Sequence, residues 1–218
     1  MVREDQETHL RVLIADDHAV VRQGLRQILA TDPDMVVAGE AKDGAEAMSM
    51  ARNVEWDVAV FDFSMPGLNG LDLLGEMKRE FPKRPVLILS MHPEDLFAAR
   101  VLKAGGAGYI TKESATQELT AAVKKVAGGG KYISSTLAES LAVDMGPDSL
   151  RPLHESLSDR EYRVMWLLAS GKQVHQISKE MGISPSTVST YRTRILKKLK
   201  LNTNAELVRY AISHKLVA

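Results

Sequence analysis

The sequence contains no cysteine among its 218 residues. Disulfide bonds and thiolate metal sites are therefore excluded, and the composition suits a reducing compartment such as the cytoplasm. No apolar run approaches the roughly 18 residues that a membrane span requires. Residues 1–8 are polar and lack the apolar core of a signal peptide. We therefore expect a cytoplasmic protein that does not interact with a membrane.

Net charge is also absent at pH 7, but the two parts of the chain differ. Residues 1–130 carry 15 Lys and Arg against 20 Asp and Glu, a net charge of −5. Residues 131–218 carry 13 against 8, a net charge of +5. An acidic part joined to a basic part predicts two domains, of which the second meets a polyanion.

Short apolar segments alternate with segments of helical period through residues 9–130. The predicted strands are 11–15, 35–38, 58–61, 86–89 and 108–110. The predicted helices are 21–29, 44–53, 71–81, 96–104 and 119–126. Five such alternations predict an α/β domain of the flavodoxin-like, doubly wound type, with a five-stranded parallel sheet and helices on both faces.

Four of the predicted strands are followed by side chains with reactive or charged groups: carboxylates, a hydroxyl and an amine. These side chains are Asp16 and Asp17, Asp62, Ser90, and Lys112. In an open α/β sheet, ligands bind at the carboxyl ends of the strands, so all of them are expected in one crevice. The six histidines have no spacing typical of a metal site.

Three carboxylates in one crevice repel one another unless a cation lies among them. Oxygen ligands without His or Cys favour a hard ion, so Mg²⁺ is the expected cofactor. A carboxylate beside Mg²⁺ and a lysine is a nucleophile that can accept a phosphoryl group. The residues of the crevice thus indicate phosphoryl transfer to an aspartate.

The pattern of the first part resembles the receiver domain of two-component response regulators over residues 9–130. The matching positions are Asp16-Asp17, Asp62, Met65-Pro66, Ser90, Tyr109 and Lys112. The resemblance implies that Asp62 is the phosphoacceptor and that a partner histidine kinase donates the phosphoryl group. It also implies that Mg²⁺ is bound by Asp16, Asp17 and Asp62, together with the backbone carbonyl of Ser64.

The same resemblance assigns a role to three further residues. Ser90 is implied to be the switch hydroxyl, and Tyr109 an aromatic side chain that changes rotamer. Lys112 is implied to pair with the phosphoryl group. By this interpretation the protein is a switch and not an enzyme.

Other interpretations of this fold fit the residues less well. A flavin binder needs a Ser-, Thr- or Gly-rich loop after the first strand to hold phosphate, where this chain has Asp16-Asp17. A phosphatase of the haloacid dehalogenase type has Asp-x-Asp, whereas position 64 is Ser. Two functional alternatives stay open. One is an Mg²⁺-dependent phosphatase that uses Asp62, and the other is a DNA-binding protein that does not respond to phosphorylation.

Residues 131–152 contain Gly and Pro breakers and are predicted to be a linker, with a short helix near 134–145. Residues 153–218 form the second predicted domain. Ser158 and Glu161 have the spacing of a capping box, and Ser184-Pro185 begins another helix after Gly182. Helix, short helix, turn and longer helix is the layout of a helix-turn-helix domain.

The helix after Ser184 contains only basic charges, because no acid occurs between Ser184 and Leu201. Residues 150–218 as a whole have a net charge of +7, which favours binding to a phosphate backbone. The candidate DNA contacts on this helix are Ser186, Thr187, Ser189, Thr190, Arg192, Arg194, Lys197 and Lys198. The hydroxyl groups lie in its first turns, where recognition helices contact bases and phosphates.

The second domain resembles the all-α, four-helix DNA-binding domain of the LuxR/NarL type. The matching residues are Leu157-Ser158, Arg160-Glu161, Leu167-Leu168-Ala169, Gly171, Ile183-Ser184, Thr187-Val188 and Lys198-Leu199. Together with the receiver, this resemblance identifies the chain as a member of the NarL/FixJ family. It implies a transcriptional regulator that binds duplex DNA and is a homodimer when phosphorylated or bound to DNA. The helix that begins at Asn204 is implied to help dimerisation, or its apolar residues only close the core.

Overall fold

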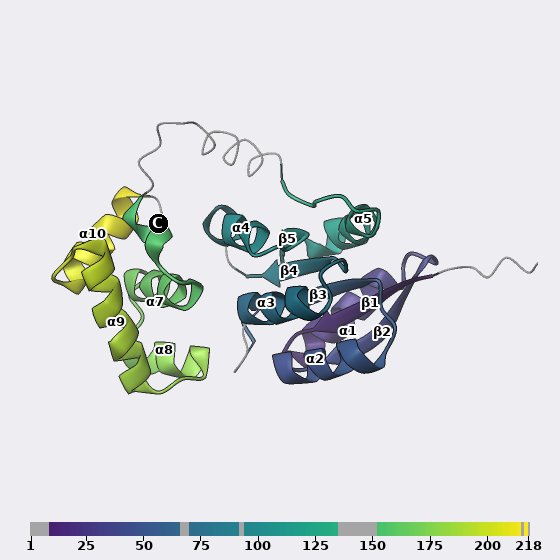
Figure 1. Ribbon diagram of the computed structural model, residues 1–218, viewed down its shortest axis with the longest axis horizontal. Helices are drawn as coiled ribbons and strands as arrows, with labels where there is room; N and C mark the ends of the chain where they lie inside the picture. Colours follow the sequence, from purple (N-terminus) through teal and green to yellow (C-terminus); the bar gives the residue numbers. More distant parts are fainter. Residues whose placement is uncertain (1–8, 66–69, 92–93, 135–151, 215, 218) are drawn as a thin grey trace, which may run out of the picture. The chain divides into compact units, whose positions relative to one another are not determined.

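The computed structural model of this protein describes residues 9–65, 70–91, 94–134, 152–214 and 216–217. The chain consists of two compact units, and the division between them falls within residues 135–151 (Figure 1). The short helix predicted near 134–145 lies almost entirely outside the described residues. Within the described ranges, no helix is both long enough and apolar enough to cross a membrane.

The first unit contains a five-stranded, fully parallel sheet with the order β2-β1-β3-β4-β5. Its strands are β1 (Leu10–Ala15), β2 (Met35–Ala41), β3 (Val58–Asp62), β4 (Val86–Ser90) and β5 (Gly108–Thr111). The chain first passes from β1 to β2 and then crosses to β3 on the other side of β1. The strand order therefore reverses between β1 and β3, which is where such folds place their ligand crevice.

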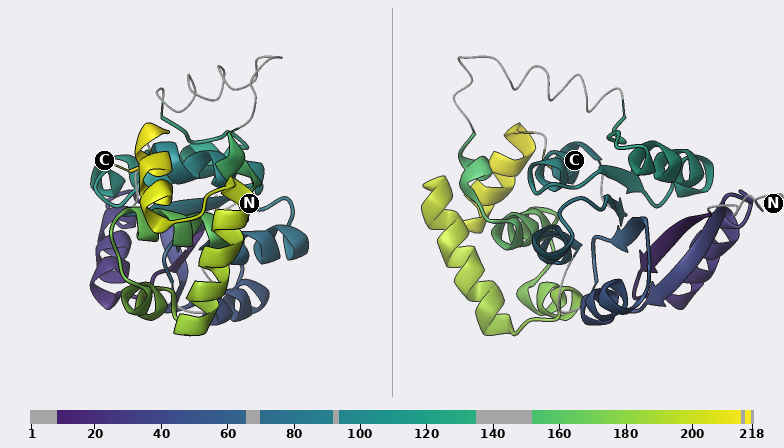
Figure 2. Two further views of the ribbon diagram at one scale, coloured as in Figure 1. Left: turned by 90° about the vertical axis from the view of Figure 1, so that its left-hand side faces the viewer. Right: turned by 45° about the vertical axis from the view of Figure 1, so that its right-hand side comes forward.

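Five helices of this unit cover both faces of the sheet (Figure 2). They are α1 (Ala19–Leu29), α2 (Gly44–Asn53), α3 (Gly70–Glu80), α4 (Glu94–Lys103) and α5 (Ala115–Ala127). The structure thus confirms the predicted doubly wound α/β domain. Two predicted bounds were wrong: β2 extends to Ala41, and α5 begins at Ala115 rather than at 119.

Both errors have a tertiary cause. The end of β2 contains Gly39 and Glu40, which have no strand pattern, but β1 pairs with this segment up to Ala41. The first turn of α5 contains mostly polar residues, yet Ala115 is buried in the core that α5 shares with α1. Hydrophobic periodicity does not reveal either contact.

The core of the first unit follows from the alternation of side chains along the strands. One set of strand residues packs with α1 and α5 in a single cluster: Val12, Ile14, Val58, Val60, Leu87 and Leu89. The residues between them, including Leu13, Ala59, Phe61 and Ile88, are also buried and point to the opposite face. Because both faces are buried, β3 and β4 consist almost wholly of apolar residues, as the sequence predicted.

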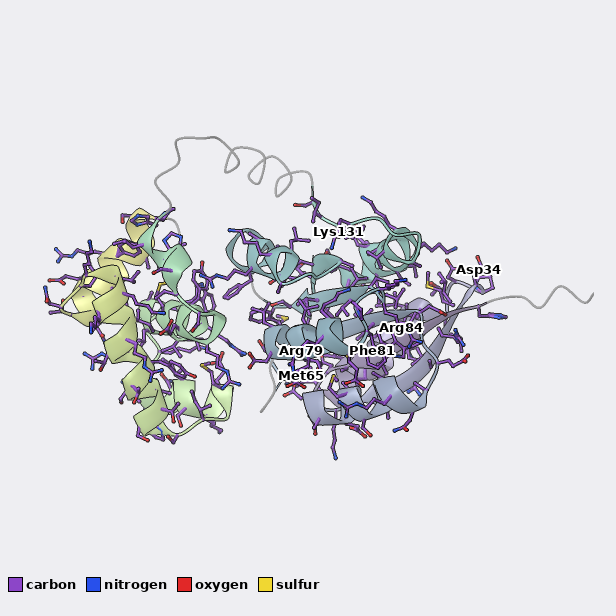
Figure 3. The ribbon with its side chains drawn as sticks, in the orientation of Figure 1. Asp34, Met65, Arg79, Phe81, Arg84 and Lys131 are labelled. Atoms are coloured by element: carbon purple, nitrogen blue, oxygen red, sulfur yellow. The ribbon has the colours of Figure 1, made fainter. Side chains whose placement is uncertain are left out.

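A buried aromatic group closes the amino end of β3. The Trp56 ring lies edge-on to Phe81, with ring centroids 5.5 Å apart, and its Nε1 donates a hydrogen bond to the Ala51 carbonyl at 3.0 Å. Arg84, labelled with Phe81 in Figure 3, places its guanidinium 4.7 Å from the centroid of the Trp56 ring. This cluster lies at the end of β3 opposite to Asp62.

The second unit is entirely helical among its described residues. It contains a 3₁₀ turn, η1 (Leu153–Ser156), and the helices α7 (Asp159–Ala169), α8 (Val174–Met181), α9 (Pro185–Leu199) and α10 (Asn204–Ser213). The predicted capping box is present, since the Ser158 N–H donates to Glu161 Oε2 at 2.8 Å and the Glu161 N–H to Ser158 Oγ at 3.4 Å. The four-helix arrangement of the second domain is therefore confirmed.

The apolar residues of the last helix divide between core and surface. Leu207, Ala211 and Leu216 are buried, so closing the core explains them. Ile212 is 52% exposed and takes no part in that core. The η1 turn is attached to α10, because the His154 N–H donates to the Tyr210 hydroxyl at 3.2 Å.

Candidate phosphoacceptor site and nucleic-acid interface

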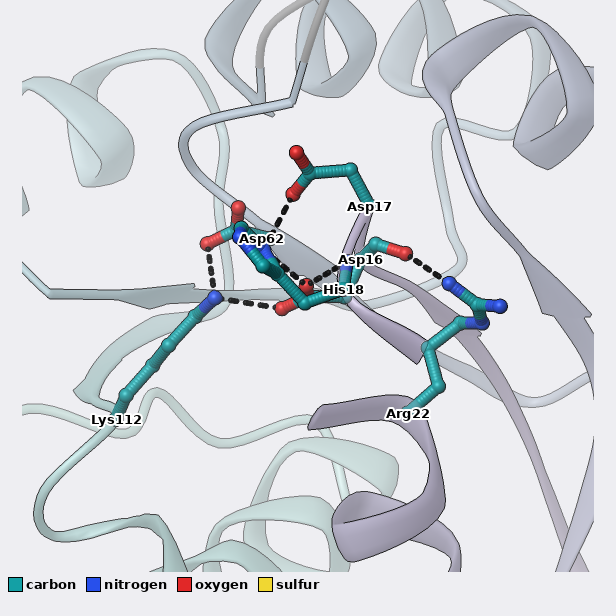
Figure 4. Close-up of polar contacts among 6 residues, drawn as sticks. All are labelled: Asp16, Asp17, His18, Arg22, Asp62 and Lys112. Carbon is teal, nitrogen blue, oxygen red and sulfur yellow. Dashed lines mark hydrogen bonds and ion pairs between the residues drawn. The ribbon is translucent and has the colours of Figure 1, made fainter. Parts of the chain in front are cut away.

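The carboxyl ends of β1, β3 and β5 bring Asp16, Asp62 and Lys112 together (Figure 4). Lys112 Nζ lies 2.6 Å from Asp16 Oδ2 and 3.0 Å from Asp62 Oδ1. Asp16 is 0% exposed and Asp62 is 2% exposed, so both carboxylates are removed from water. The convergence that the strand ends predicted is thus found for these three residues.

Asp16 is held in place by several elements. Its N–H donates to the Ala41 carbonyl of β2 at 3.1 Å. Its own carbonyl accepts a hydrogen bond from Arg22 Nη1 of α1 at 2.7 Å, and its Oδ1 accepts one from the His18 N–H at 2.8 Å. Because both its main chain and its carboxylate are fixed, Asp16 presents its second oxygen, Oδ2, to the crevice.

Asp17 and His18 form the rim of the crevice. Asp17 Oδ1 is shielded from solvent and accepts no hydrogen bond. His18 Nδ1 lies 2.9 Å from it, but without hydrogen-bond geometry. Potential metal-binding atoms of Asp16, Asp17 and His18 all lie within 4.8 Å of one another. His18 was not among the predicted ligands, although its position directly after the acidic pair was an available signal.

Burial and neighbouring charges set the ionisation of the crevice. Burial raises the pKa of Asp62, and the negative charge of Asp16 adds to this, while Lys112 acts in the opposite direction. Burial alone would lower the pKa of Lys112, but Asp62 and Asp16 outweigh it, so the net shift of this pKa is upward. Lys112 therefore stays protonated as the cation between two buried carboxylates.

The turn after β3 packs tightly against the start of α3. The Gly70 N–H donates to the Phe63 carbonyl at 3.0 Å, and a Cβ atom at position 70 would lie 2.7 Å from the Asp62 carbonyl oxygen. Only glycine fits at this distance. Ser64, in the same turn, is half-buried, and its backbone N–H donates to the Asp62 carboxylate. Pro66 lies outside the described residues.

Ser90 and Tyr109 lie on the neighbouring strands. Ser90 is fully buried at the end of β4, and its carbonyl accepts a hydrogen bond from the Lys112 N–H at 2.7 Å. The Tyr109 side chain is buried in β5. Both residues are therefore on the β4–β5 side of Asp62.

The donor set of the crevice suits a hard cation. Asp16 and Asp62 share a single lysine, and Asp17 lies beside Asp16 without any contact to that lysine, so the carboxylates outnumber the cation that pairs with them. The shielded Asp17 Oδ1, without a hydrogen-bond donor, is an oxygen that a metal ion would satisfy. The residues present therefore fit a divalent ion with oxygen ligands.

In the second unit, α9 buries one side and exposes the candidate DNA contacts on the other. Val188, Ile195 and Leu199 are buried. The exposed candidates are Ser186, Ser189, Thr190, Arg194, Lys197 and Lys198, whereas Thr187 and Arg192 are half-buried. The exposed side of α9 thus carries hydroxyl groups near its start and basic groups towards its end.

The basic candidates on α9 are not equivalent. Lys198 Nζ lies 2.6 Å from Glu161 Oε2 and 3.3 Å from the Ser156 carbonyl. Arg192 Nε donates to Asn204 Oδ1 at 2.7 Å. Arg194 and Lys197 are exposed and form no ion pair with any residue that the structure describes. They are therefore the candidates whose charge is most available to a partner.

Replacing Lys198 by Ala is expected to destabilise the second unit, because Glu161 is only 5% exposed and would lose its cation. A loss of about 1–2 kcal/mol in the free energy of unfolding is expected from a buried group that loses its partner. Lys197→Ala, which removes the same charge one residue earlier, should change it by less than about 0.5 kcal/mol. Denaturant unfolding measures both. Equal losses in the two variants would show that the Glu161 contact contributes nothing.

The loss of stability in Lys198→Ala is also expected to depend on pH. Burial by itself raises the pKa of Glu161, but Lys198 and the Ser158 hydrogen bonds outweigh it, so the pKa is lowered below its ordinary value of 4.5. A lowered pKa in the folded state contributes stability at pH values above the unfolded pKa, and this contribution is lost as the pH falls. The deficit of Lys198→Ala should therefore be present at pH 7 and shrink below about pH 4.

The fold and the acidic crevice define a signalling receiver joined to a helical DNA-binding domain, and comparison with known proteins agrees. Residues 12–124 match the response regulator receiver domain, and residues 155–211 match the bacterial regulatory proteins of the luxR family. The chain belongs to the NarL/FixJ family of DNA-binding response regulators of two-component systems.

Its relatives cover nearly the whole chain. The response regulator UvrY of Escherichia coli strain K12 is 36% identical over 208 residues, which are 95% of each chain. The response regulator GacA of Pseudomonas aeruginosa is 35% identical over 209 residues, 95% of this chain and 98% of GacA. A structure of RcsB from Salmonella typhimurium has a TM-score of 0.70 at 27% identity, covering 94% of this chain and 98% of RcsB. RcsB has also been solved in complex with DNA, with a TM-score of 0.58 at 27% identity.

Proposed function

We propose that a partner histidine kinase phosphorylates Asp62 in an Mg²⁺-dependent reaction and that this modification changes the affinity of the second unit for duplex DNA. One observation carries the proposal: a buried carboxylate at a strand end lies 3.0 Å from a protonated lysine that also pairs with the buried Asp16. A nucleophile in this environment can accept a phosphoryl group.

In the proposed reaction, a carboxylate oxygen of Asp62 attacks the phosphorus atom of a phosphohistidine. The new O–P bond forms as the P–N bond breaks, and the imidazole nitrogen takes up a proton. Lys112, which now pairs with both Asp16 and Asp62, is placed to pair with the phosphoryl oxygens. Mg²⁺, bound by Asp16, Asp17, Asp62 and the Ser64 carbonyl, would spread the charge of those oxygens.

The acyl phosphate carries about −1.5 to −2 charges where the carboxylate carried −1, so the crevice becomes more negative. The phosphoryl group offers acceptor oxygens to the Ser90 hydroxyl, which lies buried at the end of the adjacent strand. A shift of Ser90 towards the phosphoryl group leaves space on the β4–β5 side, into which Tyr109 can rotate. The protein is thereby proposed to have two states that differ around α4 and β5.

For the output, we propose that α9 enters the major groove of duplex DNA, with Arg194 and Lys197 on phosphates and the hydroxyl groups near its start on base edges or phosphates. RcsB offers a parallel, because a structure of two RcsB dimers bound to two parallel DNAs has been solved. A homodimer on DNA is the proposed assembly of this chain as well, and the exposed Ile212 of α10 is a candidate contact.

The test compares the affinity of the wild-type protein for a duplex, selected by the protein from a random pool, under three conditions. These are no phosphodonor, acetyl phosphate with Mg²⁺, and acetyl phosphate with a chelator. Affinity is expected to rise about tenfold in the second condition alone, within the range that is usual for coupled sites. Unchanged affinity despite phosphoryl uptake would support a DNA-binding protein that does not respond to phosphorylation. Repeated turnover of phosphomonoesters would instead support a phosphatase.

A further inference from the structure

The chain does not leave the sheet of the first unit when α5 ends. Tyr132 forms a parallel bridge with Gly108 of β5. Its N–H donates to the Ala107 carbonyl at 2.9 Å, and its carbonyl accepts a hydrogen bond from the Tyr109 N–H at 3.3 Å. Since β5 is the last strand in the sheet order, Tyr132 extends the sheet at this edge by one residue pair.

Side chains on α5 and on the neighbouring residue reinforce this attachment. The Tyr132 hydroxyl donates to Glu118 Oε2 at 3.2 Å, and Lys125 Nζ lies 5.7 Å from the centroid of the Tyr132 ring. Lys131, labelled in Figure 3, donates from Nζ to the Gly106 carbonyl at 2.5 Å. We call this set of contacts the Tyr132 seat.

Gly108 makes the seat possible by its lack of a side chain. A Cβ atom at position 108 would lie 2.3 Å from the Tyr132 carbonyl oxygen, 2.9 Å from Tyr132 Cβ and 2.9 Å from Leu87 Cδ2, the flexible end of a side chain. The clash with the Tyr132 carbonyl is with backbone, so a change of side-chain rotamer cannot relieve it. Any larger residue at 108 would therefore displace Tyr132 from the edge of β5. The glycine is thus required by close approach of two chain segments and not by a turn.

The seat is joined directly to residues of the proposed switch. Its donor on β5 is the backbone of Tyr109, the proposed rotamer switch. Glu118, which holds the Tyr132 hydroxyl, also accepts from Ser114 Oγ at 3.2 Å, and Ser114 Oγ lies 3.1 Å from Thr111 Oγ1. Thr111 precedes Lys112. The backbone bridge thus links β5 directly to Tyr132, from which the chain continues towards the second unit, and the Glu118 contact is a secondary link to the other end of β5.

We propose that Tyr132 is a positioning residue that transmits the state of the receiver to the DNA-binding unit, by fixing where the chain departs from β5. This inference rests on the proposed function. If the Tyr132 bridge opens, the chain beyond α5 is held only by the hydrogen bonds of Gly128-Gly129-Gly130 to the last turn of α5 and by the Lys131 side chain. Glycines have a wide range of backbone conformations, so a displacement of β5 would be absorbed there instead of reaching the second unit.

The test uses the full-length chain with three substitutions. Tyr132→Ala removes the ring and hydroxyl contacts, and Gly108→Ala displaces Tyr132 by the clash described above. Tyr132→Phe keeps the ring and the backbone bridge and is the matched control. Hydrogen exchange of the Tyr132 amide verifies the seat: this amide should exchange slowly in the wild type and in Tyr132→Phe, and at least about tenfold faster in the other two variants.

Two further quantities are then measured for each variant: uptake of phosphate from acetyl phosphate, and the ratio of DNA affinities with and without the phosphodonor. Tyr132→Ala and Gly108→Ala are expected to take up phosphate within about twofold of the wild-type rate, yet to lose most of an affinity ratio of about ten. Tyr132→Phe should retain that ratio.

An unchanged ratio in a variant whose Tyr132 amide exchanges rapidly would overturn the proposal. So would a loss of phosphate uptake in both unseated variants, since Tyr132 would then act within the receiver and not on its output. If Gly108→Ala fails to fold, Tyr132→Ala alone decides. Failure of the proposed function is a separate outcome, because it shows in the wild type as absent uptake or a ratio of one.

Discussion

Replacement of Asp62 by Asn is expected to abolish phosphoryl uptake from acetyl phosphate, by a factor of about 10³ or more. The amide is nearly the same size as the carboxylate but lacks a nucleophilic oxygen. Incorporation of labelled phosphate into the wild type and the variant measures the effect. Equal incorporation would mean that another carboxylate is the phosphoacceptor, and Asp16 would be the next residue to test.

The same substitution is expected to stabilise the receiver against unfolding at pH 7. Burial and the nearby Asp16 raise the pKa of Asp62 in the folded state. A raised pKa means that the contribution of this carboxyl group to stability is present at low pH and is lost as the pH rises through the folded-state value. The neutral Asn avoids that loss. The gain should therefore be visible in thermal unfolding at pH 7 and shrink towards pH 4.

Asp57, just before β3, provides a matched control with the opposite sign. Arg11 donates to its carboxylate from Nε at 3.0 Å and from Nη2 at 2.9 Å, and these hydrogen bonds lower the pKa of Asp57. Its contribution to stability is present above the unfolded pKa and is lost as the pH falls. Asp57→Asn should therefore destabilise the receiver at pH 7 while leaving phosphate uptake intact. A stabilised Asp57→Asn or a destabilised Asp62→Asn would contradict this account.

Removal of Arg194 and Lys197 together is expected to weaken binding to duplex DNA by about 10- to 100-fold at low salt. The reason is that neutralising phosphates releases bound counterions, so each phosphate contact adds close to one unit to the slope of log affinity against log salt. The double variant should lose about two units of that slope. Fluorescence anisotropy with a labelled duplex, measured over a series of salt concentrations, gives both quantities.

A control for this experiment removes an exposed charge elsewhere in the second unit. Arg209 lies exposed on α10, so Arg209→Ala changes net charge without changing α9. Its affinity for the duplex is expected to stay within about threefold of the wild type, and the salt slope should be unchanged. A flat salt response in the wild type, or equal losses in Arg209→Ala and the double variant, would remove α9 from the interface.

Much of the fold is visible in the sequence because its signals are local. A run of four apolar residues before Asp62 predicts a strand buried on both faces, and the structure has that strand. The capping residues Ser158 and Ser184 act within a single turn of helix, so their spacing alone identified two helix starts. The extent of β2 and the first turn of α5 were not predictable in this way, because β1 and α1 stabilise them from outside the segment.

The residues of the candidate site also fall into those that the sequence predicted and those whose role depends on tertiary contacts. The rule that ligands bind at the carboxyl ends of parallel strands was enough to predict from the sequence that Asp16, Asp62 and Lys112 lie together. It did not identify Gly70, whose role depends on a 2.7 Å approach to the Asp62 carbonyl. In the second unit, the charge pattern of α9 did not distinguish Lys198 from Lys197, although Lys198 pairs with a buried glutamate that lies 37 residues away in the chain.

The sequence by itself determined the order of strands and helices, the residues at the strand ends and the charge of each part. These properties depend on neighbours within a few positions or on composition. Only the tertiary structure decided which charges are already paired, as for Lys112 with Asp16 across 96 residues, and which chain segments touch, as for Tyr132 with Ala107. Such contacts arise when distant elements pack together, and no local pattern of side chains encodes the distances at which they meet.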